Sequence, residues 1–215
     1  MKRTKLAFKF SFLILVTIGF TGCFSYTAML GTTYKYDYAM IKKDDSTSKT
    51  DTTQNMNFED DKILANFNVG DKQISFTIKN KTDNVLKIIW DEAAIVQFGT
   101  SHKVMHSGVK YIDRNSSQPP TAIPPQASID DIVLPADNVY YREGSYSTYY
   151  SNPGGWEEHD LFPKNDLNKP EIKETIMNLS GQTFSVYLPI QYQEKTLDYT
   201  FNFVITRVSP LIQNQ

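Results

Sequence analysis

Hydrophobic and polar residues alternate along much of the chain beyond residue 60. In the first such stretch the apolar positions are Ile63, Ala65, Phe67 and Val69, and after a Gly70-Asp71 turn they are Ile74, Phe76 and Ile78. Alternation with a period of two is typical of strands that bury one face. The pattern predicts two strands joined as a hairpin, followed by a second turn over residues 80–84, where Asn, Thr and Asp favour tight backbone conformations.

The C-terminal part of the chain carries the same pattern. Its apolar positions are Phe184, Val186, Leu188 and Ile190, and after a polar turn they are Tyr199, Phe201, Phe203 and Ile205. These positions predict a second hairpin. Shorter apolar runs predict further strands over 85–90 and 94–98, with weaker signals over 104–112 and 129–134.

The expected elements define an all-β fold with one short helix. Pro170 opens the helix and Gly181 closes it, with Ile172, Ile176 and Leu179 on one face. Strands at intervals of roughly ten residues favour an antiparallel β-sandwich, and an eight-stranded β-barrel is the alternative. Trp90 occupies the place where an immunoglobulin-like sandwich often holds its core Trp, so we expect it in the core of such a sandwich.

The first 22 residues read as a targeting segment. A basic start over residues 1–5 precedes an apolar run from Phe10 to Phe20. That run is too short for a transmembrane helix, which needs about 20 apolar residues, but it fits the apolar part of a signal peptide, which needs about 7 to 15.

The end of this segment, Phe20-Thr21-Gly22-Cys23, resembles the lipobox of bacterial lipoproteins. The resemblance implies that signal peptidase II cuts before Cys23, that its sulfur carries a diacylglycerol, and that the new amino terminus takes an acyl chain such as palmitate. Phe24 stands where an Asp would retain an enterobacterial lipoprotein in the inner membrane. The resemblance therefore implies an outer-membrane lipoprotein. No acidic cluster of the kind that marks surface export in some bacterial lipoproteins follows Cys23, which favours a domain that faces the periplasm over one exposed at the cell surface. Independently, an exported chain with a single Cys has no internal disulfide to form, and lipidation uses that thiol.

The residues after the anchor predict a tether. Residues 23–60 are expected to form the lipidated N-terminus and a flexible linker, and residues 61–215 the β-sandwich domain, because residues 42–57 contain a single apolar side chain, Met56. A flexible span of about 35 residues would reach roughly 30 to 35 Å and would let the domain stand clear of the lipid. Tyr34, Tyr36 and Tyr38 leave an alternative open, because their spacing also fits an edge strand.

Charge and chemistry-bearing residues give no catalytic signature. Without the four basic residues before Cys23 the chain has 18 basic and 24 acidic residues, a net charge of −6, which argues against a nucleic-acid partner. His102 and His106 would lie about 13 Å apart in a strand, too far to share a metal ion, so we expect exposed or capping imidazoles. The adjacent acid pairs Asp60-Asp61, Asp130-Asp131 and Glu157-Glu158 are expected to be solvated charges. We therefore predict no enzyme activity, metal site or cofactor.

Residues 139–156 are the candidate functional surface. Tyr140, Tyr141, Tyr146, Tyr149, Tyr150 and Trp156 lie there among Gly, Ser and Asn residues. This is the composition of recognition loops, in which rigid aromatic rings supply contact area and small polar residues adapt their hydrogen bonds. The first hypothesis is binding of a protein partner in the envelope, and the alternative is a carbohydrate-binding or adhesive surface. A third reading is that the aromatics fold back over one end of the sandwich.

Overall fold

The computed structural model describes residues 31–43 and 50–211, and the targeting segment with Cys23 lies outside these described residues. Antiparallel strands dominate the described part of the chain, which also contains one α-helix. The predicted all-β class is therefore confirmed. None of the described helices is long and apolar enough to cross a membrane.

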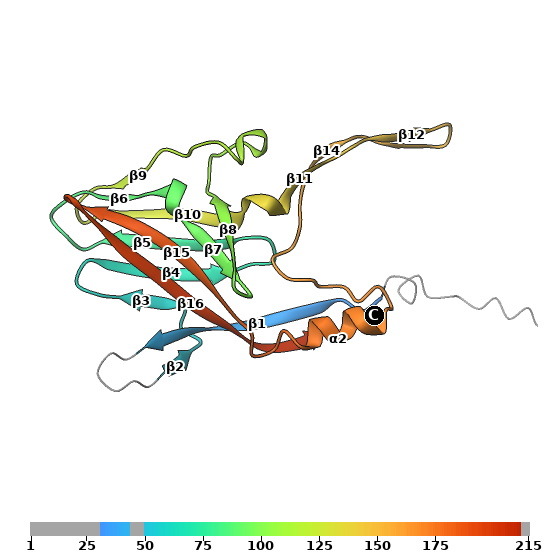
Figure 1. Ribbon diagram of the computed structural model, residues 1–215, viewed down its shortest axis with the longest axis horizontal. Helices are drawn as coiled ribbons and strands as arrows, with labels where there is room; N and C mark the ends of the chain where they lie inside the picture. Colours follow the sequence, from blue (N-terminus) through green and yellow to red (C-terminus); the bar gives the residue numbers. More distant parts are fainter. Residues whose placement is uncertain (1–30, 44–49, 212–215) are drawn as a thin grey trace, which may run out of the picture.

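Twelve strands form one sheet that curls into two facing layers (Figure 1). The first layer contains β2 (Thr50–Thr53), β1 (Tyr34–Lys43), β16 (Lys195–Pro210), β15 (Thr183–Tyr192), β7 (Ala94–Gln97), β8 (Thr100–Met105), β6 (Leu86–Ile88) and β9 (Thr121–Ile123). The second layer contains β10 (Ser128–Pro135), β5 (Ile74–Asn80), β4 (Ile63–Val69) and β3 (Asn57–Glu59). The end of β8 joins the layers, because Met105 pairs with Leu134 of β10. The outermost strands of the described path, β2 and β3, do not pair with each other, so the sheet is curled and open along one side.

The hydrophobic core lies between the two layers. The ring of Phe67 in β4 packs on the rings of Phe201 and Phe203 in β16, with centroids 4.5 Å and 5.4 Å apart. These contacts bury the alternating apolar faces of both predicted hairpins against each other. The hairpins themselves are confirmed, since β4 pairs with β5 and β15 pairs with β16 along their lengths.

Trp90 is fully buried, as expected for a core residue. Its Nε1–H donates a 2.7 Å hydrogen bond to the Thr121 hydroxyl, which satisfies the one polar atom of the ring. Trp90 begins a short 3-10 helix, η1 (Trp90–Glu92), so the strand predicted over 85–90 ends earlier, at Ile88. The strand predicted over 104–112 is wrong beyond Met105, where the chain turns and enters η2 (Tyr111–Asp113).

The predicted flexible linker is wrong for the described residues between 31 and 60. β1 pairs with β16 on one side and with β2 on the other, and β3 pairs with β4. Tyr34, Ala39 and Met40 of β1 are buried, so the tyrosine spacing signalled a strand. The described residues from 31 to 60 therefore belong to the folded domain, which does not start at residue 61.

Asp166 fixes the point where the described chain enters the fold. Its carboxylate accepts hydrogen bonds from the Thr32 backbone N–H at 2.7 Å and from the Tyr34 hydroxyl at 3.1 Å. A Cβ on Gly31 would lie only 2.5 Å from the same carboxylate, so only glycine fits there, with a positive φ of 77°. These contacts hold residues 31–34 against the loop that precedes the helix.

The predicted helix is confirmed as α2 (Pro170–Met177), with Pro170 at its first turn. Ile176 is fully buried, and Ile172 packs against the same core. The helix lies at the end of the molecule where β16 ends (Figure 1).

Candidate functional site

The Tyr-rich segment forms an arm that leaves the body of the molecule (Figure 1). After the 3-10 helix η3 (Ala136–Asn138), β11 (Val139–Arg142) pairs with β14 (Gly155–Glu158), and further out β12 (Ser145–Ser147) pairs with β13 (Tyr150–Asn152). Neither pair belongs to the twelve-stranded sheet. We call residues 139–158 the aromatic arm.

Two glycines let the arm pass from one strand pair to the next. A Cβ on Gly154 would lie 2.9 Å from the Gly144 backbone nitrogen and 2.8 Å from the Tyr141 hydroxyl. A Cβ on Gly144 would in turn lie 2.7 Å from the Gly154 nitrogen. Since real Cβ atoms do not approach that closely, side chains at these two positions would push the two chains apart.

The root of the arm rests on a small apolar cluster of its own. Its buried members are Met105, Leu134, Ala136 and Val139, with Val109, Tyr111, Ile132 and Trp156 packed against them. Trp156 is held on three sides: Tyr141 meets its ring edge-on at 5.5 Å, Tyr111 lies 6.3 Å away, and the Arg114 guanidinium stands 5.0 Å above it. The arm is therefore braced against the body through Trp156.

Charged side chains brace the same root. Glu157 accepts hydrogen bonds from Arg142 and, at 2.9 Å, from the Tyr140 hydroxyl. The bond from Arg142, and then that from Tyr140, hold the pKa of Glu157 below its ordinary value, while the bond to Glu157 raises the pKa of Tyr140. Tyr140 also stacks on His159 at 4.2 Å. Hydrogen bonding to ionised partners in this way fixes orientation more than it adds stability at a surface.

The six predicted aromatic residues thus divide into two groups. Tyr140 and Trp156 belong to the root and are partly buried. The other four are exposed, with exposed fractions of 98% for Tyr149, 74% for Tyr146, 59% for Tyr150 and 55% for Tyr141, whose ring also meets Trp156. The reading in which these rings cover one end of the sandwich is wrong for these four.

Sequence reasoning missed the residues that support the arm. Tyr111 and Arg114 come from the segment around η2, and Tyr111 donates a hydrogen bond to Glu158. The Glu157-Glu158 pair was expected to be solvated, but each carboxylate is bonded to a tyrosine of the root. Nothing in the local pattern of 111–114 signals this contact, because it joins positions more than 40 residues apart.

The other acid pairs also have structural partners. Asp60 accepts the Tyr199 hydroxyl at 2.8 Å, and Asp130 accepts the Thr77 hydroxyl at 2.5 Å. Asp131 was expected to be solvated, and this is wrong, since its side chain is only 8% exposed. It accepts the backbone N–H groups of Ser107 and Ile132, both at 2.8 Å.

His102 and His106 contact different partners and do not form a shared site. His106 was expected to be exposed or capping, and this is wrong: its ring lies flat on Trp90 with centroids 4.1 Å apart, and its Nδ1 is 3.3 Å from Asp131. His102 lies 3.6 Å from Asp137. Within the described residues no group of three or more His, Cys, Asp or Glu side chains is placed to hold a metal ion.

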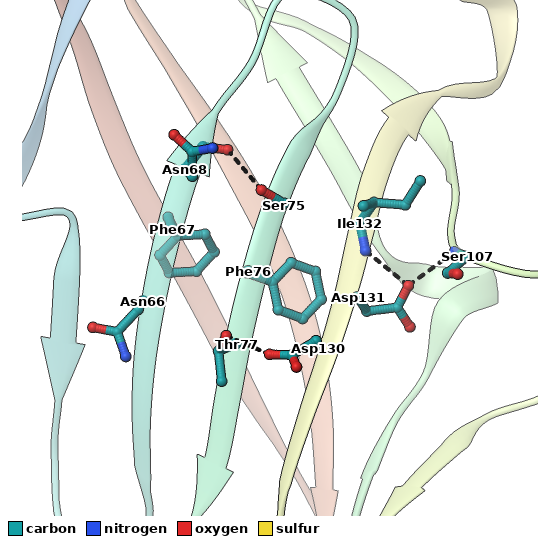
Figure 2. Close-up of a pocket in the computed structure, with 10 residues that line it drawn as sticks. All are labelled: Asn66, Phe67, Asn68, Ser75, Phe76, Thr77, Ser107, Asp130, Asp131 and Ile132. Carbon is teal, nitrogen blue, oxygen red and sulfur yellow. Dashed lines mark hydrogen bonds between the residues drawn. The ribbon is translucent and has the colours of Figure 1, made fainter.

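A shallow pocket of about 460 Å³ lies along β4, β5 and β10. Figure 2 shows Thr77 turned toward Asp130 across neighbouring strands, and Ser75 bonded to the Asn68 backbone. The hydroxyls of Ser75 and Thr77 are thus engaged with neighbouring strands. The pocket therefore presents a largely polar surface between β4, β5 and β10.

Comparison of the chain with protein-family models, with curated proteins and with solved structures found no match. The function is therefore inferred from the aromatic arm and the residues that support it.

Proposed function

We propose that this protein is a lipid-anchored protein of the bacterial cell envelope that binds a protein partner through the aromatic arm and catalyses no reaction. The observation that carries the proposal is the exposure of Tyr146, Tyr149 and Tyr150 at the end of a braced hairpin. Exposed apolar rings on a fixed support are typical of binding surfaces, since their burial gains contact area with little loss of conformational freedom.

The size of this surface suits a protein interface. A buried tyrosine contributes about 150–250 Å², so the exposed fractions of these three supply about 350–580 Å², against about 800 Å² per partner in a standard interface. Arg142, the last residue of β11, and Glu143, which follows it, would add a polar rim. An outer-membrane anchor at Cys23 would hold this surface in the periplasm.

Site-specific photocrosslinking tests the binding surface. A photoreactive phenylalanine analogue replaces Tyr149 in cells that produce the protein, with the same analogue at Ile112, which is 72% exposed and lies outside the arm, as the control. We expect one discrete adduct from position 149, none from position 112, and loss of the adduct when Tyr146 and Tyr150 are both changed to Ala. Equal labelling from both positions would contradict a binding arm, and capture of glycans by the purified protein without any protein adduct would favour the carbohydrate alternative.

The anchor is tested separately by Cys23→Ser. The variant is expected to accumulate as an unprocessed precursor without lipid, detected by mass spectrometry of the intact protein. Normally processed protein in the membrane fraction would contradict lipidation at Cys23.

A further inference from the structure

The first described residues of the folded domain follow the proposed anchor closely in the sequence. Residues 31–34 are already fixed by Asp166, and the Thr33 carbonyl accepts the Leu211 N–H at 2.8 Å. The eight Cα-to-Cα steps from Cys23 to Gly31 span at most about 29 Å when fully extended. The end of the domain that holds Gly31 therefore stays within that distance of the lipid, instead of being separated from it by a 35-residue linker.

Two large apolar side chains are exposed at this entry point, and a third is exposed at the C-terminal end of α2. Leu167 follows Asp166 directly and is 56% exposed, Leu211 follows β16 and is 46% exposed, and Met177 ends α2 and is 41% exposed. Figure 1 shows α2 beside the end of β16, at the opposite end of the molecule from the β15–β16 turn. We call these three residues the anchor-proximal face.

The exposed charges on α2 and directly before it cancel one another. Exposed Lys169 and Lys173 are balanced by exposed Glu171 and Glu174 on α2. Contact with lipid would therefore depend on burial of apolar side chains and not on counter-charges in the head groups. A short tether raises the effective concentration of the membrane next to this face, so a contact too weak to bind a free protein is still populated.

We propose that the anchor-proximal face rests on the surface of the membrane that holds the Cys23 lipid. This inference rests on the proposed lipidation. The aromatic arm leaves the body toward the same end of the long axis as α2 (Figure 1), so the arm meets its partner close to that membrane. Contact with the lipid fixes the orientation of the domain, and this orientation places the aromatic arm close to the membrane surface.

Spin labels on the full-length, lipidated protein test the contact. Because Cys23 carries lipid, an added cysteine is the one free thiol, and Leu167→Cys, Met177→Cys and Leu211→Cys are labelled one at a time in phosphatidylethanolamine and phosphatidylglycerol vesicles. Val85→Cys is the matched control, since Val85 is 44% exposed and lies beside Gln193 of the β15–β16 turn. The measurement is the collision rate of each label with oxygen, which concentrates in lipid, relative to a water-soluble nickel chelate.

We expect this ratio to be severalfold higher at all three face positions than at Val85, and unchanged in high salt. Equal ratios at the four positions would overturn the inference while leaving lipidation and the arm untouched. Labels at the face that are immobilised and reached by neither reagent would also overturn it, because a protein would then cover the face. A labelled thiol in the parent protein would show Cys23 to be unmodified, and would overturn the anchor and this inference together.

Discussion

Asn80 joins three segments of the chain through one fully buried side chain. Its Nδ2 lies 2.7 Å from the Asn84 carbonyl oxygen and 3.0 Å from those of Ile123 and Pro124, and its Oδ1 accepts the N–H and hydroxyl of Thr82. The turn over 80–84 was predicted from its composition. The contact with residues 123 and 124, more than 40 positions away, gave no local signal.

We expect Asn80→Ala to lower the free energy of unfolding by at least about 2 kcal/mol, because each buried group left without a partner costs about 1–3 kcal/mol. Urea unfolding followed by circular dichroism measures the loss. Asn84→Ala is the control, since that side chain is exposed and should change stability by less than about 0.5 kcal/mol. Equal losses in the two variants would show that the bonds of the Asn80 amide are not what stabilises this turn.

Asp166, which holds residues 32 and 34 in the fold, makes the stability of the fold depend on pH. The backbone N–H of Asn168, followed by that of Thr32, lowers the pKa of this carboxyl below its ordinary value of 3.8, because both donate to the ionised form. A carboxyl whose pKa is lower in the folded state stabilises the fold above its unfolded pKa, and this contribution is lost as pH falls below about 4 toward the folded value.

Asp166→Asn is therefore expected to lower the melting temperature at pH 7, and the difference from the parent should shrink as pH falls below about 4. Melting curves of both proteins from pH 7 to pH 3 measure it. Asp113→Asn provides a control, because this exposed acid caps no entry segment. A difference that stays constant across the whole pH range would argue against a role for the ionised Asp166.

Among the elements, β2 is a strand that the sequence pattern did not predict. Both major hairpins and α2 were predictable because their own apolar periodicity marks the buried face. The region 42–57 lacks that signal, yet β2 forms, and its backbone pairs with β1 along its length. The arm was recognisable by composition alone, whereas its support by Tyr111 and Arg114 depends on tertiary contacts that no local pattern contains.

The close approach of the two chains of the arm, between its two strand pairs, depends on Gly154. We expect Gly154→Ala to separate the two chains of the arm, because its Cβ would meet backbone atoms at 2.9 Å, and so to reduce the photocrosslinked adduct formed at position 149. Gly155→Ala is a closely matched control, since nothing lies within 4 Å of its Cβ. The melting temperature should be the same in both variants, because the arm lies outside the twelve-stranded sheet. Full adduct formation by Gly154→Ala would show that the close approach of the chains at Gly144 and Gly154 does not position Tyr149.

At the scale of the whole molecule, the fold is held by contact between layers that pair along one side only. β8 bridges them through two residue pairs with β10, and the described path leaves β2 and β3 unpaired with each other. Side-chain packing between the layers must therefore supply most of the stability, and the aromatic rings of β4 and β16 are its centre. Sequence periodicity predicted which faces are buried, but it did not specify which strands meet across the core.

Phe67→Ala tests this dependence. Phe67 is 6% exposed and contacts Phe76 as well as the two β16 rings, so its loss opens a cavity between the layers. We expect the free energy of unfolding to fall by about 3–5 kcal/mol, with tryptophan fluorescence, measured in a Trp156→Phe background so that only Trp90 reports, and circular dichroism of the strands changing in one coincident transition. Phe98→Ala, at a residue 51% exposed, should cost far less. If strand signal persisted after the Trp90 signal was lost, the layers would unfold independently and the packing between them would not be what holds the domain together.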